Sequence, residues 1–373
     1  MYRLKLYYGI KPLVPVAVRR EIRRWFALRK RRRVRDVWPV LPGSERPPEG
    51  WPGWPGGKQF ALVLTHDVEG RAGLDKCRQL MELERQLGFR SCFNFVPEGG
   101  YDVPRQLRQE LAANGFEVGV HDLYHNGKLF LREKEFSRNA LKINHYLKDW
   151  GAAGFRSAFM LHNLHWIHDL NVLYDTSTFD TDPFEPQPNG QETIFPFWVP
   201  RNGERQTGNQ AKPNLSSRLA PLVPVDPSAP STVSSPGYVE LPYTLPQDST
   251  LFLILGERRP DIWFQKLDWI ARHGGMALVN VHPDYLRFDD HANSRVGYPV
   301  GLYARFLNYA RHLYGDSAWH VNPGELARWY RETPSLQGGV ASDIGRSIDF
   351  SPARHVNWSR LPAAAKGWAV RPQ

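Results

Sequence analysis

The chain of 373 residues has only two cysteines, Cys77 and Cys92. Neither has a partner at the spacing of a metal site or a disulfide framework, so we interpret both as reduced packing residues. No apolar run approaches the roughly 18 residues of a membrane span. The N-terminal stretch is interrupted by lysine and proline and lacks the pattern of a secretory signal peptide. We therefore expect a cytoplasmic protein.

An excess of charge of either sign is missing from most of the chain. Residues 59–373 contain 33 Lys and Arg against 34 Asp and Glu, whereas residues 1–58 contain 15 against 4. The net charge of +10 thus belongs to an N-terminal extension. The main body lacks the basic surplus that is typical of nucleic-acid binding, and we expect no specific nucleic-acid partner.

Residues 16–37 combine apolar and basic side chains at helical spacing, with Trp25 and Phe26 on one side and a run of arginines around them. A basic amphipathic helix is typical of a membrane-surface anchor and predicts peripheral contact with a membrane. Two alternatives stay open. The segment docks on its own domain or is a solvated tail, or it contacts nucleic acid without sequence preference.

Composition divides the chain into three predicted parts. Residues 1–57 form the basic arm and a linker rich in Pro, Gly and Trp, residues 58–333 form a catalytic domain, and residues 334–373 form a poorly structured tail. Within the middle part, residues 201–236 are rich in Pro, Ser and Asn. This segment is too long for an ordinary connection, so we expect an active-site lid or a mobile insertion.

Strand-like and helix-like runs alternate from residue 58 onward, which predicts an α/β fold with a parallel sheet or barrel. The predicted strands are 60–66, 90–96, 116–121, 153–157, 172–175, 193–199, 237–243, 250–255 and 276–282. The predicted helices are 72–87, 104–114, 131–149, 260–273, 299–314 and 323–331.

Ionisable side chains stand at the ends of five predicted strands. They are Asp67, His121, Arg156, Asp175 and His282. Because the carboxyl ends of parallel strands meet at one edge of a sheet, we expect these residues to form one shared site.

The pair His121 and His125 is a candidate metal site. If the chain opens into a helical turn after the strand, imidazoles four residues apart lie on one face, within reach of a single cation. A hydrolytic Zn²⁺ site needs a third protein ligand and an open position for water. Asp67 and Glu69 are the candidates for that oxygen ligand.

The order and spacing of these motifs resemble the polysaccharide deacetylases of carbohydrate esterase family four. The first motif, Thr65-His66-Asp67-Val68-Glu69, is similar to the branch of that family in which the motif is Thr-His-Asp-Val-Asp. The resemblance covers roughly residues 58–330. It implies a deformed (β/α) barrel, a carbohydrate substrate and one divalent metal, with Zn²⁺ expected.

Carried over to this sequence, the resemblance implies a role for each residue. Asp67 is the general base that takes a proton from the water on the metal, and Arg156 pairs with Asp67. His121 and His125 bind the metal. His282 is the general acid that protonates the leaving amine. For Asp175 two roles are open, orienting His282 or lining the acetyl pocket.

The sequence departs from the family pattern at the first motif. Val68 stands where the common family has a metal-binding Asp, and Glu69 is the nearest substitute. Glu69 projects on the same side of an extended strand as Asp67, so the base and ligand roles of these two carboxylates can be exchanged.

Together with these residues, the resemblance implies a metal-dependent hydrolase that removes an N-acetyl group from a glycan or glycan precursor. A lipid-linked sugar intermediate at the inner leaflet agrees with the predicted cytoplasmic location and with the basic arm. Two alternatives stay open. One is hydrolysis of another C–N bond, such as that of a cyclic amide, and the other is a non-catalytic glycan-binding relative.

Overall fold

The computed structural model describes residues 16–201, 237–289 and 297–337, with side chains described from residue 24 onward. Except for residue 201, the predicted insertion 201–236 lies outside the described residues, as does the predicted tail beyond residue 337. Within these ranges no helix has the length and apolar character that crossing a membrane requires.

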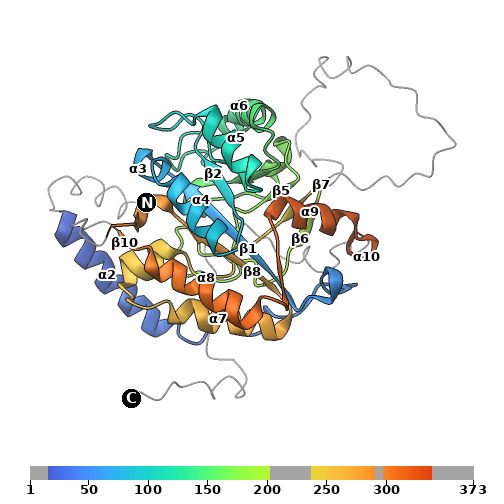
Figure 1. Cartoon of the computed structure of the whole chain (residues 1–373). Coiled ribbons are helices and arrows are strands. Elements are labelled where there is room, and N and C mark those ends of the chain that lie inside the picture. The colour runs from blue at the N-terminus through green and yellow to red at the C-terminus, as the bar shows by residue number, and fades with distance from the viewer. Residues whose placement is uncertain (1–15, 202–236, 290–296, 338–373) are drawn as a thin grey trace, which may run out of the picture.

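One nine-stranded sheet forms the centre of the molecule, and a two-stranded ribbon stands beside it (Figure 1). The strands are β1 (Phe60–Val68), β2 (Cys92–Phe95), β3 (Glu117–His121), β4 (Gly154–Arg156), β5 (Tyr174–Asp175), β6 (Phe197–Pro200), β7 (Gly237–Glu240), β8 (Met276–Val281), β9 (Leu286–Arg287), β10 (Tyr298–Pro299) and β11 (Ala318–His320).

The sheet is parallel except at β6, which pairs with β7 in the antiparallel direction. Its strand order is β11-β1-β2-β3-β4-β5-β7-β6, and β8 pairs with β1. The start of β1 lies between β8 and β11, and its end lies between β8 and β2.

Irregular segments complete the ring between β7 and β8. The backbone N–H of Thr244 donates to the carbonyl of Leu278 (3.2 Å), and the N–H of Met276 donates to the carbonyl of Ile194 (2.7 Å). The sheet therefore curls into a deformed β/α barrel, which confirms the predicted fold class.

The α-helices are α2 (Val16–Arg33), α3 (Arg71–Leu74), α4 (Cys77–Gln86), α5 (Arg105–Ala113), α6 (Glu133–Trp150), α7 (Asp261–His273), α8 (Gly301–Tyr314), α9 (Pro323–Glu332) and α10 (Pro334–Gln337). Within the described ranges the 3₁₀- and π-helical turns are η2 (Pro55–Gly57), η3 (Ala158–Met160), η4 (Trp166–Asp169), η6 (Ser249–Leu255) and η7 (Pro283–Tyr285). Figure 1 shows α7 and α8 on one side of the sheet, α5 and α6 on another, and α9 near one end.

Alternation along β1 separates two sets of side chains. Phe60, Leu62 and Leu64 belong to the apolar core shared with α7 and α8. Ala61 and Val63 belong to a second core, inside the curl of the sheet and beside α9. Because successive strand residues point to opposite faces, the later odd-numbered residues of β1 also point inward.

The arm docks on the domain through its described part. Ala27 is 7% exposed and belongs to the main core, while Arg31 pairs with Glu257. One side of α2 thus packs against the domain, which agrees with the alternative that this segment docks on its own domain.

One predicted strand is wrong. Residues 250–255 form the π-helical turn η6, because Leu251, Phe252 and Leu255 face the core at helical spacing. The folded part of the chain also continues past residue 333, since Leu336 of α10 is buried.

Candidate metal centre

Asp67 lies on the inner side of β1 with both carboxylate oxygens engaged. The amide of Asn94 donates to Oδ1 (3.0 Å) and the amide of Asn280 donates to Oδ2 (2.7 Å). Arg156 places Nη1 3.5 Å from the same Oδ2. Burial opposes ionisation, but the nearby charges, with Arg156 first among them, lower the pKa of Asp67 well below its usual range. Asp67 is therefore a fixed, ionised acceptor.

Arg156 is fully buried and connects β4 to β1 and to the residue that follows β5. Its Nε donates to Thr176 Oγ1 (2.9 Å), and its Nη2 donates to Thr65 Oγ1 (3.1 Å). The predicted pairing of Arg156 with Asp67 is present as a close ionic contact.

The neighbouring residue His66 points the opposite way, as strand alternation requires. Its Nε2 lies 2.8 Å from Glu84 Oε1, and its Nδ1 lies 3.1 Å from the carbonyl oxygen of Val281. Glu84 also accepts hydrogen bonds from Ser91 and Tyr303. His66 thus links β1 to α4 and lies on the other side of the strand from Asp67.

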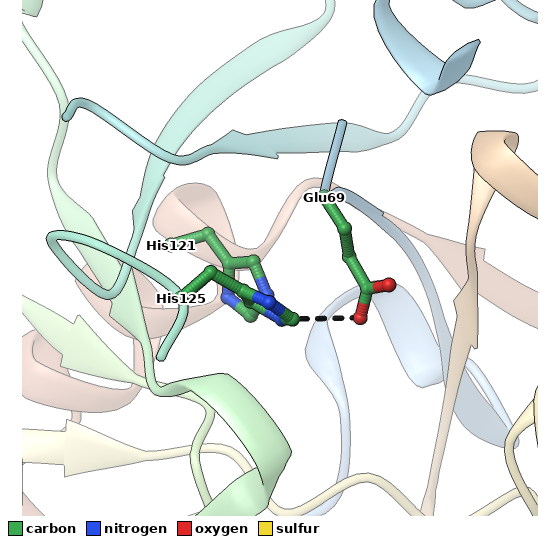
Figure 2. Close-up of side chains that lie close together, drawn as sticks. All are labelled: Glu69, His121 and His125. Atoms are coloured by element: carbon green, nitrogen blue, oxygen red, sulfur yellow. Dashed lines mark ion pairs between the residues drawn. The ribbon is translucent and has the colours of Figure 1, made fainter. Parts of the chain in front are cut away.

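Glu69, His121 and His125 form the one cluster of three possible metal ligands among the described residues. One donor atom from each lies within 4.8 Å of the other two. Figure 2 shows the Glu69 carboxylate pointing toward the two imidazoles. Glu69 Oε1 lies 3.1 Å from His125 Nε2, which is an ion-pair distance, but the two atoms do not form a hydrogen bond.

The unpartnered atoms in this cluster are those that a metal would need. Nε2 of His121 and Nε2 of His125 are buried and have no hydrogen-bond partner among the described residues. His121 Nδ1 lies 3.1 Å from the carbonyl oxygen of Arg156. A proton on Nδ1 satisfies that contact and leaves the lone pair of Nε2 free to bind a cation. The residues present therefore fit a divalent ion with one oxygen and two nitrogen ligands, as Zn²⁺ takes in catalytic sites.

The two histidines meet without the helical turn that the sequence analysis assumed. The chain after β3 is a loop, in which Asp122 and His125 have positive φ angles of 56° and 50°. Their left-handed conformation turns the chain sharply, and the two imidazole centroids are 5.0 Å apart. The expected proximity is present, but its expected cause was wrong.

The geometry distinguishes the two carboxylates of the first motif. Glu69 belongs to the cluster, whereas the oxygens of Asp67 accept hydrogen bonds from two amides. Tyr285 donates to Glu69 Oε2 (2.7 Å), and Asp284 accepts from the Glu69 backbone N–H (2.9 Å). Burial opposes ionisation of Glu69, but contact with His125 and the charge of His282 lower its pKa to about 2.

His282 follows β8 and is oriented by Asp248. Its Nδ1 lies 2.6 Å from Asp248 Oδ1, and its backbone N–H donates to Oδ2 (2.9 Å). Tyr298 also donates to that Oδ2 (2.8 Å). Burial disfavours the imidazolium, but the charge and hydrogen bond of Asp248 outweigh it and raise the pKa of His282 to about 10. His282 Nε2 lies 3.7 Å from Glu69 Oε1, beside the metal cluster.

Asp175 does not hold His282, so one of its two expected roles belongs to Asp248. Asp175 Oδ1 accepts from Ser177 Oγ (2.7 Å), and the residue stands opposite Glu240 in the register of β5 and β7. Burial raises the pKa of Asp175 to about 6, and it raises the pKa of Glu240 as well. Burial thus favours the protonated form of this carboxyl pair.

Three residues of the site, Asn94, Asn280 and Asp248, were not predicted from the sequence. Both asparagines stand inside apolar strands, in Cys92-Phe93-Asn94-Phe95 and Leu278-Val279-Asn280-Val281. A polar residue on the inner face of such a strand is the signal that could have indicated them. Asp248 precedes a segment that was assigned as a strand, so its position at the start of a helical turn was hidden.

Structural comparison identifies the fold. No protein-family model matches this sequence, and no curated protein gives a significant match. A Mycobacterium smegmatis protein assigned to the polysaccharide deacetylases superimposes with a TM-score of 0.50 and 15% sequence identity, over 74% of this chain and 91% of that chain. The chain has the polysaccharide deacetylase fold.

Two further structures match less closely. A family 4 carbohydrate esterase from Streptomyces lividans, in complex with acetate, is 12% identical over 70% of this chain and 91% of its own, with a TM-score of 0.37. A Bacillus anthracis protein described as a family 4 pseudoenzyme is 12% identical over 74% of this chain and 66% of its own, with a TM-score of 0.39. At these identities the likeness to polysaccharide deacetylases concerns the fold alone.

Proposed function

We propose that this protein is a metal-dependent deacetylase that hydrolyses an N-acetyl group on a carbohydrate. The observation that supports it most strongly is the convergence of Glu69, His121 and His125 on one point, with an ionised carboxylate and an imidazolium close by. The fold that places them is shared with a protein assigned to the polysaccharide deacetylases.

Glu69, His121 and His125 would hold the cation, and Zn²⁺ is the ion proposed. When bound, such an ion makes water acidic near neutral pH and offers positive charge to the developing oxyanion. Nε2 of each imidazole has no hydrogen-bond partner among the described residues, and Nδ1–H of His121 can donate to the carbonyl oxygen of Arg156.

Asp67 would act as the general base. Hydrogen bonds from Asn94 and Asn280 fix the plane of its carboxylate, and each oxygen has a second lone pair to accept a proton from the attacking water. The positive charge of Arg156 keeps Asp67 ionised before the reaction.

His282 would act as the general acid. A pKa of about 10 means that the imidazole is protonated at neutral pH, so it can donate to the leaving amine. Asp248 Oδ1 accepts a hydrogen bond from Nδ1–H, so that Nε2 faces the metal cluster. Base and acid therefore reach the scissile amide from different strands, β1 and β8.

Metal content and acetate release test this proposal together. Full-length protein loaded with Zn²⁺ should retain about one ion per chain and release acetate from N-acetylated oligosaccharides. Glu69→Gln should lose the ion or bind it at least about tenfold more weakly. It should also release acetate at least about 100-fold more slowly. Glu110→Gln removes a carboxylate that pairs with Arg78 away from the cluster and should change neither.

Three results would contradict the proposal. A His121→Ala, His125→Ala double variant that retains the ion would rule out the metal site. Ring-opened product from a cyclic amide, without acetate, would favour the alternative C–N hydrolase. Glycan binding without hydrolysis in the metal-loaded protein would favour the non-catalytic relative.

A further inference from the structure

Helix α2 has two chemically different faces along residues 24–33. A helix turns about 100° per residue, so positions 27, 30, 31 and 34 lie on one side, and positions 25, 28, 29 and 32 lie on the other. The first side contacts the domain. Lys30 donates to the carbonyl of Pro183, and Arg31 pairs with Glu257. We call the opposite side the outer face of α2.

The outer face combines large apolar side chains with arginines. Its members are Trp25, Phe26, Leu28, Arg29, Arg32 and Arg33, and all are exposed. Trp25 is 56% exposed and Phe26 is 60% exposed, although each is large enough to bury a substantial apolar area. Residues 24–33 include no acidic side chain that would neutralise the arginines.

This grouping is unusual for the described surface. The other large exposed aliphatic residues include Leu131, Leu141 and Leu313, which are separate and belong to different segments. Scattered apolar residues are normal on a protein surface, whereas a contiguous patch indicates an interaction site. Trp25 and Phe26 are adjacent, with ring centroids 4.9 Å apart in an edge-to-face arrangement.

The side-chain chemistry selects the partner. Arginines next to tryptophan, phenylalanine and leucine on one helix face match the boundary between anionic headgroups and acyl chains. Nucleic acid phosphates would satisfy the arginines but leave Leu28 and Phe26 in water. Helix α2 lies at the periphery of the molecule (Figure 1), and the side chains of its outer face are exposed.

We propose that the outer face of α2 binds the surface of an anionic phospholipid bilayer. Trp25, Phe26 and Leu28 enter the headgroup region, and the arginines contact lipid phosphates. The opposite side of the helix stays on the domain, so binding requires no unfolding. This proposal does not depend on the chemistry at the metal cluster.

Co-sedimentation of the full-length protein with vesicles tests it. Vesicles that contain phosphatidylglycerol should bind the protein at least tenfold more tightly than pure phosphatidylcholine vesicles, and binding should weaken as salt rises. Trp25→Ser, Phe26→Ser should reduce binding to anionic vesicles at least tenfold. Arg29→Gln, Arg32→Gln, Arg33→Gln should reduce it as much and flatten the salt dependence.

Matched controls remove the same chemistry elsewhere. Leu141→Ser, Leu313→Ser takes away two exposed leucines, and Arg85→Gln, Arg138→Gln, Arg305→Gln takes away three exposed charges; both should bind like the unaltered protein. Circular dichroism confirms that each variant is folded. Equal loss in the controls, unchanged binding by the Trp25, Phe26 variant, or preference for duplex DNA over anionic vesicles would overturn the proposal.

Discussion

The geometry around His282 makes Asp248 the residue whose replacement is most informative. Asp248→Asn keeps the size of the side chain but removes the negative charge beside the imidazole. We expect kcat for acetate release to fall by about 100-fold or more, because the imidazolium loses both its stabilising charge and its fixed orientation. Steady-state kinetics should show little change in KM, and the bound Zn²⁺ should remain.

Tyr298→Phe is the control for this prediction. It removes one hydrogen bond to Asp248 and leaves the contact between Asp248 and His282 intact. Its activity should fall by less than tenfold. Equal losses in the two variants would mean that Asp248 acts through the packing of the segment.

The sequence predicted the charged residues of the site but not the two asparagines that donate to Asp67. Asp67, His121 and His282 were identifiable because an ionisable group at the end of an apolar strand requires a reason to be there. Asn94 and Asn280 lie within strands and are neutral. Their polarity inside an apolar strand marks them as unusual, but it does not show that they donate to Asp67. Their role appears only when the register places them on either side of β1.

Strand β3 leaves room for Asn94 because it has a glycine, Gly119, at the facing position. Gly119 stands opposite Asn94 in the register of β2 and β3, and a Cβ at position 119 would lie 2.1 Å from Asn94 Oδ1. Gly119→Ala should therefore displace the amide that donates to Asp67. We expect acetate release to fall by about tenfold.

A double-mutant comparison checks that cause. If Gly119→Ala acts through Asn94, it should lower activity much less in an Asn94→Ala background than in the unaltered protein. Gly301→Ala, where nothing lies within 4 Å of the new methyl group, should leave activity unchanged. Additive losses at positions 119 and 94 would contradict this explanation.

The prediction of elements was most reliable where an apolar run was long or clearly periodic. β1, α6 and α7 correspond closely to the predicted ranges. The run 250–255 was misassigned because a short, uniformly apolar segment has no period that separates a strand from a helical turn. The loop between His121 and His125 depends on two residues with positive φ, and neither is a glycine that would have indicated the turn.

For the whole molecule, one acidic residue outside the metal cluster, Glu185, has a stability cost that should vary with pH. Burial raises the pKa of Glu185 to about 8, and its Oε1 accepts from Tyr243 (2.8 Å) and Gln247 (2.7 Å). The folded state therefore holds a proton that the unfolded chain releases near pH 4.3. Ionisation of Glu185 therefore destabilises the protein progressively as pH rises from about 4.3 through 8.

Glu185→Gln removes that titration and keeps an oxygen acceptor. Its free energy of unfolding should resemble that of the unaltered protein at pH 5 and exceed it by about 2–4 kcal/mol at pH 9. A difference of about 4 kcal/mol would apply to a fully buried carboxyl group. Because the Glu185 side chain is only partly buried, we expect a difference closer to about 2 kcal/mol. Thermal unfolding at both pH values measures the difference. A constant difference between the two proteins would show that Glu185 does not retain its proton.

The alternation along β1 has a consequence for the ancestry and engineering of this chain. In β1 the odd position 67 supplies the carboxylate held by Asn94 and Asn280, and the even position 66 supplies the histidine that contacts Glu84 of α4. The strand therefore tolerates only one phase of its alternation. Inserting a single residue between Leu64 and Thr65 would turn His66 toward the metal cluster and bury Asp67 against α4, leaving a carboxylate without its two amides. Length changes in descendants of this protein should therefore be confined to the connections, and β1 should tolerate substitutions at its apolar positions while rejecting every one-residue insertion or deletion.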